Sequence, residues 1–345
     1  MKAKQAIQAV IGLGLAAVLL IWGLPYFAKT SWADIWGVVR HIPWHQVLIF
    51  QALMLAGLYC YTFTFTGSLR GLSHSRALIV NLCGSSVSNL LPGGGAVGLA
   101  ATYAILRSWG FSRRATSTSA IVTGVWNLLA RIALPVVALF ALWWGNRNLP
   151  DALATAAVAG FASGVGILGL FVALLVSEPF ALWLGRLVDR FMRRFFPKRV
   201  ARQSMSTEDV VRDVRHRTND VVIHGWWSMT LGMVGFFGLY FVLWVLIMRG
   251  TGVMLPLGML FAAFAIGRLL TAVGVTPGGL GVTETAAAAT LVAWGAPPAA
   301  ATAGVVLFSV FTHLMEVPLG ALGWVLWTIS PKSEVSDEEQ AVSSG

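Results

Sequence analysis

The sequence predicts an all-α integral membrane protein with about six full spans and two re-entrant helical hairpins in an inverted repeat. Three observations carry this prediction: the composition, a stretch that occurs twice, and the distribution of basic residues. Of the 345 residues, 57% are hydrophobic and 11% are charged, whereas an average soluble domain has about 25% charged residues. The mean hydropathy is +0.76. We therefore expect residues 1–330 to form a single polytopic membrane domain.

The repeated stretch covers residues 92–122 and residues 277–307, at a constant offset of 185. Each copy has a Pro-Gly-Gly break, a small-residue helix, a Trp-Gly stop and a second small-residue helix. Broken hydrophobic segments at corresponding places in two halves of a chain point to a transporter-like site. The repeat units predicted on this basis are about 77–145 and 253–329.

The chain begins with two apolar segments at residues 6–27 and 45–67. Each has about 20 residues, which is long enough to cross a bilayer. The tryptophan-rich residues 28–44 between them are predicted to lie at the membrane interface. We interpret the first segment as an uncleaved span, because no clear small-x-small cleavage site follows it.

Two pairs of short apolar arms flank the Pro-Gly-Gly breaks, at residues 77–91 with 96–106 and at residues 253–274 with 283–294. At 1.5 Å per residue, most of these arms are too short to cross a hydrocarbon core of ~30 Å. Each pair fits a re-entrant hairpin. Its tip must be buried in protein or line a wet cavity, because lipid cannot satisfy its backbone.

The remaining elements complete the predicted membrane domain. Residues 179–222 hold ten of the 24 basic residues, with apolar residues at helical spacing. We interpret this segment as a basic amphipathic helix on the cytoplasmic surface, and an ordinary solvated linker helix is the alternative. The acidic, serine-rich tail 331–345 is predicted to be disordered. The other full spans are predicted at residues 115–145, 152–176, 223–248 and 298–329.

The basic residues predict the orientation. With both termini in the cytoplasm, eighteen of the 24 Lys and Arg residues fall inside and four outside, as the positive-inside rule requires. Three full crossings separate the hairpins, so the first enters from the cytoplasm and the second from outside. The net charge of +10 is therefore interpreted as a topology signal and an attraction to anionic lipid, not as a nucleic-acid footprint. The expected location is the cytoplasmic (inner) membrane.

Four ionisable residues are predicted at membrane depth: Arg131, Arg268, Glu284 and Glu316. A charge at the centre of a span costs ~2.5–3.5 kcal/mol, so each should face protein or water. Arg131 and Glu316 are related by the repeat offset. We expect them to pair or to line a cavity together, with a static ion pair as the structural alternative. Glu284 either complements a helix dipole or holds a proton or cation. His313, one turn before Glu316, is either a proton relay or a buried hydrogen-bonded histidine.

The glycine-rich tips are the second candidate feature. Free N–H groups at the helix starts after each tip favour an anion such as a lipid phosphate, but the glycines also suit close helix packing. Gly93, Gly95 and Gly98 match G-x-G-x-x-G, yet no strand precedes them, which excludes a dinucleotide site. The residues predicted to bind lipid are Pro92, Gly93, Gly94, Gly95, Arg131, Arg268, Pro277, Gly278, Gly279, Glu284, His313 and Glu316.

No catalytic residue, metal site or cofactor is predicted. Cys60 and Cys83 lie in apolar stretches without metal-ligand spacing. No Ser/His/Asp order and no pair of catalytic carboxylates stands out.

The motif SNLLPGGGAVGLAATYAILRSWG at residues 88–110, followed by VTPGGLGVTE at residues 275–284, resembles a known membrane protein family. Its type is the N-terminal flippase region of bacterial lysylphosphatidylglycerol synthase, and stand-alone relatives include proteins linked to archaeal glycolipid assembly. The resemblance covers about residues 5–330. It implies broken helices around a central cavity and translocation of a polar-headed lipid between leaflets.

Two features depart from the family pattern. The aminoacyltransferase domain of the synthase is absent, so lysyl transfer is not expected. Gly98-Leu99 and Trp126-Asn127 stand where many relatives carry charged residues, so the head-group preference of those relatives does not carry over.

We therefore expect a flippase-like transporter of an anionic or polyprenyl-phosphate-type lipid, and not an enzyme. Two alternatives stay open. One is a membrane-embedded lipid-modifying enzyme with Glu284, His313 and Glu316 as acid and base groups. The other is a non-catalytic scaffold in glycolipid or cell-envelope assembly. The expected partner is a membrane lipid with an anionic head group, and a homodimer or cell-envelope biosynthetic enzymes are further partners left open.

Overall fold

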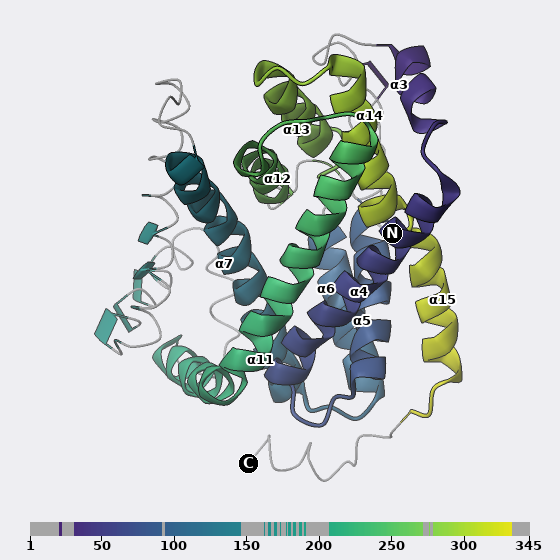
Figure 1. Ribbon diagram of the computed structural model, residues 1–345. Helices are drawn as coiled ribbons and strands as arrows, with labels where there is room; N and C mark the ends of the chain where they lie inside the picture. The colour runs from purple at the N-terminus through teal and green to yellow at the C-terminus, as the bar shows by residue number, and fades with distance from the viewer. Residues whose placement is uncertain are drawn as a thin grey trace.

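The computed structural model of the protein is helical, and no strand occurs among the residues it describes (Figure 1). It describes residues 21–22, 31–91, 94–145, 207–271, 276 and 279–332, with scattered positions between 162 and 190. The helices used below are α3 (Trp32–Val39), α4 (Trp44–Ser68), α5 (His74–Leu90), α6 (Gly94–Ser108), α7 (Arg113–Gly145), α11 (Thr207–Gly250), α12 (Leu257–Leu270), α13 (Val282–Ala293), α14 (Pro298–Ser309), the π-helix η3 (Val310–Leu314) and α15 (Glu316–Ile329).

Several described helices are long and apolar enough to cross a membrane, which confirms an all-α, multi-pass membrane protein. They span Trp44–Ser68, Arg113–Phe140, Thr218–Gly250 and Pro298–Ile329, and they coincide with four of the predicted spans. The number of six spans stays a prediction. The predicted spans 6–27 and 152–176, the basic segment as far as residue 206 and the tail from residue 333 lie wholly or largely outside the described residues.

One long helix is more continuous than predicted. α11 runs without a break over 44 residues, across the predicted boundary at residue 223 between the basic segment and a full span. No proline interrupts this stretch, so the ladder of backbone hydrogen bonds continues through it. α7 also stays helical past Pro135.

The two repeat units contain helices with matching ends. At the offset of 185, α6 and α13 end at the equivalent residues Ser108 and Ala293. α7 and α14 begin at the equivalent residues Arg113 and Pro298. The helix boundaries of the described residues therefore match at the offset of the sequence repeat.

The Trp-Gly stop has the same structure in both units. Gly110 and Gly295 have φ values of 86° and 91°, in the left-handed region that favours glycine at a helix C-terminus. The N–H after each glycine returns to the carbonyl five residues back, at 3.4 Å from Leu106 and 3.0 Å from Leu291. Each stop turns the chain directly into the next helix.

Each long segment contacts the short pair of the other unit as well as that of its own, since α7 also contacts α6 and α14 contacts α13. α7 contacts α12, and α15 contacts α5, while α6 stays on α5 and α13 on α12. In Figure 1, α5 and α6 lie in the lower half of the bundle and α12 and α13 lie at the top. The two short pairs therefore occupy opposite ends of the bundle.

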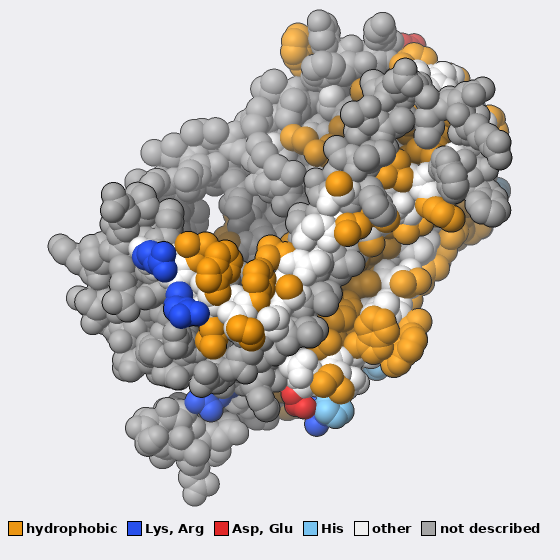
Figure 2. Space-filling model, turned by 90° about the vertical axis from the view of Figure 1, so that its left-hand side faces the viewer, with side chains coloured by type: hydrophobic (Ala, Val, Ile, Leu, Met, Phe, Trp, Pro, Cys, Tyr) orange, Lys and Arg blue, Asp and Glu red, His pale blue; other side chains and the backbone are white. Residues whose placement is uncertain are grey.

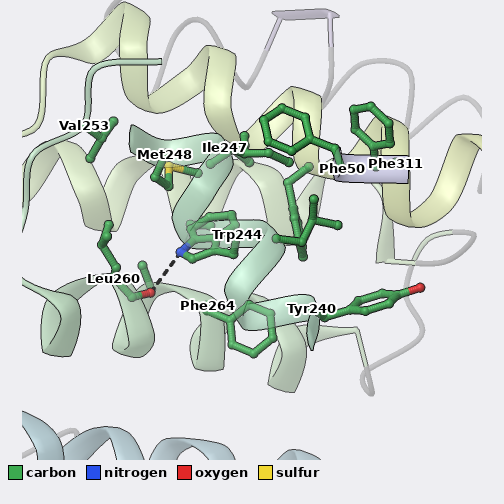
Figure 3. Close-up of a cluster of buried hydrophobic side chains, with 14 of the residues drawn as sticks. Phe50, Tyr240, Trp244, Ile247, Met248, Val253, Leu260, Phe264 and Phe311 are labelled. Atoms are coloured by element: carbon green, nitrogen blue, oxygen red, sulfur yellow. Dashed lines mark hydrogen bonds between the residues drawn. The ribbon is translucent and has the colours of Figure 1, made fainter. Parts of the chain in front are cut away.

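A hydrophobic core holds α11 against α12 and the second unit. Figure 3 shows Trp244 at its centre, with its indole N–H donating to the Leu260 carbonyl at 3.0 Å. The centre of its ring lies 5.0 Å from that of the Phe308 ring in an edge-to-face arrangement. Aromatic pairs prefer this geometry. Tyr240, one turn earlier on α11, is buried at the edge of this cluster with its hydroxyl directed away from it (Figure 3). The packing of the Tyr240 ring in this core therefore sets the position of its hydroxyl group.

The outer surface of the described helices is apolar. Large hydrophobic side chains on α7 and α11 are exposed, among them Val137, Phe140, Leu231 and Val234. Figure 2 shows hydrophobic side chains over the described part of one lateral face from end to end. An apolar surface of this extent suits contact with lipid.

One end of the bundle is fastened by paired tryptophans. The indole N–H of Trp109 donates to Ser330 Oγ at 3.0 Å, and that of Trp327 donates to Ser108 Oγ at 2.9 Å. The Arg76 guanidinium lies over the Trp109 ring at 5.2 Å. The start of α5, the turn between α6 and α7 and the end of α15 therefore meet at this end.

Candidate functional site

A cavity of about 420 Å³ lies between the two short helix pairs. Side chains from α4, α5, α6, α7, α11, α12 and the η3–α15 segment line it, together with Thr276 and Gly279 near the second break. It brings together seven of the predicted site residues, from both repeat units. They are Gly94, Gly95, Arg131, Arg268, Gly279, His313 and Glu316.

Arg131, on α7, is held in the cavity wall by hydrogen bonds to both units. Its Nε donates to Asn127 Oδ1 at 2.8 Å, one turn earlier on the same helix. One terminal nitrogen donates to the Arg268 carbonyl at 3.1 Å and to the Thr271 hydroxyl. These bonds orient the guanidinium and connect α7 to the end of α12.

Arg268, on α12, is the more deeply buried cation, with 7% of its surface exposed. Neither a hydrogen bond nor an ion pair joins its guanidinium to any described residue. It lies near the rings of Phe264 and Phe308, at 5.9 Å and 5.1 Å from their centres. A desolvated cation of this kind is costly unless an anion or hydrogen-bond acceptor approaches it. Its donors are therefore available to a ligand in the cavity.

Glu316, at the start of α15, faces the same cavity and has 7% of its surface exposed. Its carboxylate accepts from Asn89 Nδ2 at 2.9 Å and from the Tyr240 hydroxyl at 3.4 Å. No ion pair connects it to Arg131 or Arg268 in the described structure. Arg131 and Glu316 thus line the cavity together without forming a static ion pair.

His313 lies in η3, where the helix changes from the α to the π pattern. Its side chain is buried and lines the cavity, and its Nδ1 lies 3.1 Å from the Thr312 hydroxyl. π-helical turns inside α-helices are common at functional sites. Here the extra residue per turn lies immediately before Glu316.

Glu284 lies outside the central cavity. Its side chain is 1% exposed and accepts from the Gly281 N–H at 2.6 Å, the Thr283 hydroxyl at 2.9 Å and the Ser309 hydroxyl. It therefore caps α13 and fastens it to α14. A small pocket of about 20 Å³ includes Glu284 and Arg268 among its lining residues. Arg268 is the one described residue that lines both this pocket and the central cavity.

The glycines near the tips differ in their surroundings. A Cβ on Gly94 would overlap the backbone of Ser88, which is a close helix approach. A Cβ on Gly95 would meet nothing within 4 Å, and Gly95 is exposed toward the cavity. The N–H of Gly281 is occupied by Glu284. The tip residues Pro92, Gly93, Pro277 and Gly278 lie outside the described part of the chain.

The structure adds residues that the sequence reasoning did not select. Neutral polar side chains from α5, α6 and α7 line the cavity beside the charged residues. The sequence signal for them was the presence of polar residues within the apolar arm 77–91. Without knowing which helices pack against this arm, the sequence could not show that these residues face a cavity. These residues include Asn81, Ser85, Ser88, Asn89, Thr102 and Asn127.

The lining charges favour an anion. Two arginines and one carboxylate are the charged groups among the described lining residues, apart from the titratable His313. In a site shielded from water, such charges interact more strongly than at a surface. No group of three or more His, Cys, Asp or Glu residues with metal-ligand geometry occurs among the described residues. The arrangement suits binding of a polar, negatively charged group by side chains alone.

The comparisons with known proteins agree with a lipid-related membrane protein. A model of the "Lysylphosphatidylglycerol synthase TM region" family matches residues 9–320, which include every described residue that lines the cavity. No curated protein matched the chain. The match covers most of the sequence, from residue 9 to residue 320. The chain therefore belongs to the family of the lysylphosphatidylglycerol synthase transmembrane region.

Proposed function

We propose that this protein moves a lipid with an anionic, phosphate-bearing head group between the two leaflets. The head group passes through the central cavity, and the acyl chains stay in the surrounding lipid. The observation that carries the proposal is Arg268, a buried cation in the cavity with no hydrogen-bond or ion-pair partner in the described chain. A guanidinium binds phosphate oxygens through several N–H groups at once.

The short helix pairs support transport through this cavity. The arms α12 and α13 have 14 and 12 residues, or ~18–21 Å at 1.5 Å per residue, which is less than a hydrocarbon core of ~30 Å. We propose that both pairs are re-entrant hairpins entering from opposite sides, as in an inverted repeat. The exchange of packing partners between the units supports this arrangement. Two such hairpins give head groups in either leaflet a polar route to the same central residues.

The basic residues support cytoplasmic termini in an inner membrane. The start of α5, the α6–α7 turn and the short stretch after α15 carry basic side chains at one end of the bundle. The described helix ends and loops at the opposite end carry fewer. The positive-inside rule assigns the first end to the cytoplasm. Its basic residues are Arg70, Arg76, Arg107, Arg113, Arg114 and Lys332.

The proposal is tested with purified protein in liposomes that contain acyl-labelled fluorescent phosphatidylglycerol. Quenching from outside with an impermeant reductant measures how fast label in the inner leaflet becomes accessible. We expect the protein to accelerate this exchange and Arg268→Gln to slow it by roughly 10–100-fold, because a charged hydrogen bond contributes ~1.5–3 kcal/mol.

The matched control is Arg113→Gln, which removes an exposed arginine at the start of α7. It should exchange lipid as fast as the unchanged protein. Exchange no faster than in protein-free liposomes would contradict transport of phosphate lipids. Recovery of a chemically altered lipid would favour the enzyme alternative.

A further inference from the structure

We infer that the cavity selects head groups that are rich in hydroxyls, such as a sugar or polyol joined to the phosphate. This inference rests on the proposed function. It assigns a role to the neutral polar wall of the cavity, which lies on other helices than the two arginines. The arginines lie on α7 and α12, whereas the described lining residues of α5 and α6 carry no charge. The two walls therefore offer different chemistry to two parts of one head group.

The neutral wall is a polar stripe along α5. Asn81, Ser85, Ser88 and Asn89 follow the i, i+4, i+7, i+8 spacing of one helix face, and all of them line the cavity. Hydroxyl and amide groups both donate and accept hydrogen bonds. A head group with several hydroxyls can exchange both kinds of bond with such a stripe, whereas a bare phosphodiester has acceptors only.

Asn81 supplies an unused donor in this stripe. Its side chain has 7% of its surface exposed, and its Oδ1 accepts from the Ser85 hydroxyl at 3.4 Å. Its Nδ2 has no hydrogen-bond partner among the described residues. A buried donor without a partner is unfavourable, so a ligand hydroxyl that accepts from Nδ2 would recover free energy on binding.

Glu316 provides the acceptor at the far end of the stripe. Asn89 and Tyr240 donate to its two different oxygens, and each carboxylate oxygen can accept a further bond. A ligand hydroxyl suits this position better than an ammonium group. The reason is that the two lining arginines repel a further cation in the same cavity.

Aromatic rings complete a surface suited to a polyol. Tyr61 and Phe236 line the cavity with ring centres 5.2 Å apart, and Phe236 lies 4.4 Å from Tyr240. The C–H faces of a sugar or cyclic polyol can pack against such rings while its hydroxyls reach the polar stripe. Apolar walls with a few placed polar groups are typical of small-molecule sites.

The test compares lipids with the same phosphodiester charge and different head-group hydroxyls. Acyl-labelled phosphatidylethanol has no head-group hydroxyl, phosphatidylglycerol has a short polyol, and phosphatidylinositol has a hydroxyl-bearing ring. In the liposome assay we expect phosphatidylinositol to exchange roughly 3–10-fold faster than phosphatidylethanol, because one or two additional hydrogen bonds contribute ~0.5–1.5 kcal/mol each.

Two variants locate the effect. Asn81→Leu removes the unused amide with little change in volume, and it should bring the ratio of phosphatidylinositol to phosphatidylethanol exchange toward one. Gln46→Leu makes the same kind of change at another amide that has an unpartnered atom. Gln46 does not line the cavity, so this variant should keep the ratio of the unchanged protein.

The outcomes separate this inference from the proposed function. Equal acceleration of all three lipids would overturn hydroxyl selection and leave phosphate-lipid transport standing. Acceleration of none of them would overturn both. If the unchanged protein shows the preference and Asn81→Leu, recovered as a folded monodisperse protein, keeps it in full, the assignment to the α5 stripe is wrong.

Discussion

At the scale of single residues, the two cavity arginines differ in how the chain supports them. Arg131 donates to Asn127, to the Arg268 carbonyl and to Thr271, so its position is set by the protein. Arg268 has no comparable bonds among the described residues and lies near two phenylalanine rings. Replacing a buried charge by an apolar group of similar size is often neutral or stabilising, whereas breaking a bonded network destabilises.

This difference predicts opposite effects of the same substitution on stability. Arg268→Met should keep or raise the midpoint of thermal unfolding in detergent, because it removes a buried cation that has no hydrogen-bond or ion-pair partner among the described residues. Arg131→Met should lower stability by ~1–3 kcal/mol, because it leaves hydrogen-bond partners unsatisfied. Fluorescence-monitored unfolding of both variants beside the unchanged protein measures this. An equal loss in the two variants would mean that the protein itself satisfies Arg268, and the proposed ligand role would lose its basis.

Residue chemistry could be predicted from the sequence only where a single residue stands out. Arg131, Arg268 and Glu316 were identifiable because charge is rare in apolar segments, and the structure places all three around one cavity. Asn81 could not be identified as a ligand-binding residue from the sequence. Serine and asparagine side chains within a helix also form hydrogen bonds to nearby backbone groups, so their presence alone does not indicate a site. Glu284 has a similar sequence signal to Glu316, but its three donors place it in a cap instead of the cavity.

At the scale of elements, the first short pair depends on glycines where α5 and α6 approach each other. A Cβ on Gly98 would overlap Ser88 Oγ and lie 2.6 Å from the Gly84 carbonyl oxygen. That carbonyl belongs to backbone and cannot rotate away. The same helix carries Gly95, which faces open space. The two glycines therefore have different structural roles three residues apart.

We predict that Gly98→Ala destabilises the protein by ~1–3 kcal/mol, because the added methyl group forces α5 and α6 apart. Gly95→Ala should change stability by less than ~1 kcal/mol, with the better helix propensity of alanine acting in its favour. Thermal unfolding of the two variants in the same detergent provides the comparison. If Gly95→Ala proves as damaging as Gly98→Ala, helix separation is not the cause.

Element ends were more predictable than element continuity. The Trp-Gly stops were visible in the sequence, because a glycine after an apolar helix marks its C-terminus, and both glycines adopt the left-handed conformation. The unbroken α11 was not predicted, since the change from polar to apolar composition near residue 223 was mistaken for a helix boundary. Composition marks where a helix leaves the membrane, but backbone hydrogen bonding decides where it ends.

At the scale of the whole molecule, the repeat units build one cavity by exchanging partners. The sequence offset predicted two similar units, but it could not predict that α7 packs on α12 and α15 on α5. The spacing of apolar residues in the sequence predicts which face of a helix is apolar. It does not predict which other helix packs against that face. The exchange makes the site a property of both units, with Arg131 from one and Arg268 and Glu316 from the other.

The same arrangement predicts the orientation of the bundle in the membrane. Met254, in the turn before α12, is 70% exposed, and Pro331 is exposed just after α15, at the end that carries most of the described basic residues. In a background with Cys60 and Cys83 replaced by alanine, Met254→Cys should react with an impermeant maleimide on intact cells. Pro331→Cys should react only after the membrane is permeabilised, because the positive-inside rule keeps that end in the cytoplasm. The reverse pattern would invert the orientation while leaving the cavity between the two short pairs unchanged, and labelling of both positions on intact cells would contradict a bundle whose two ends lie on opposite sides.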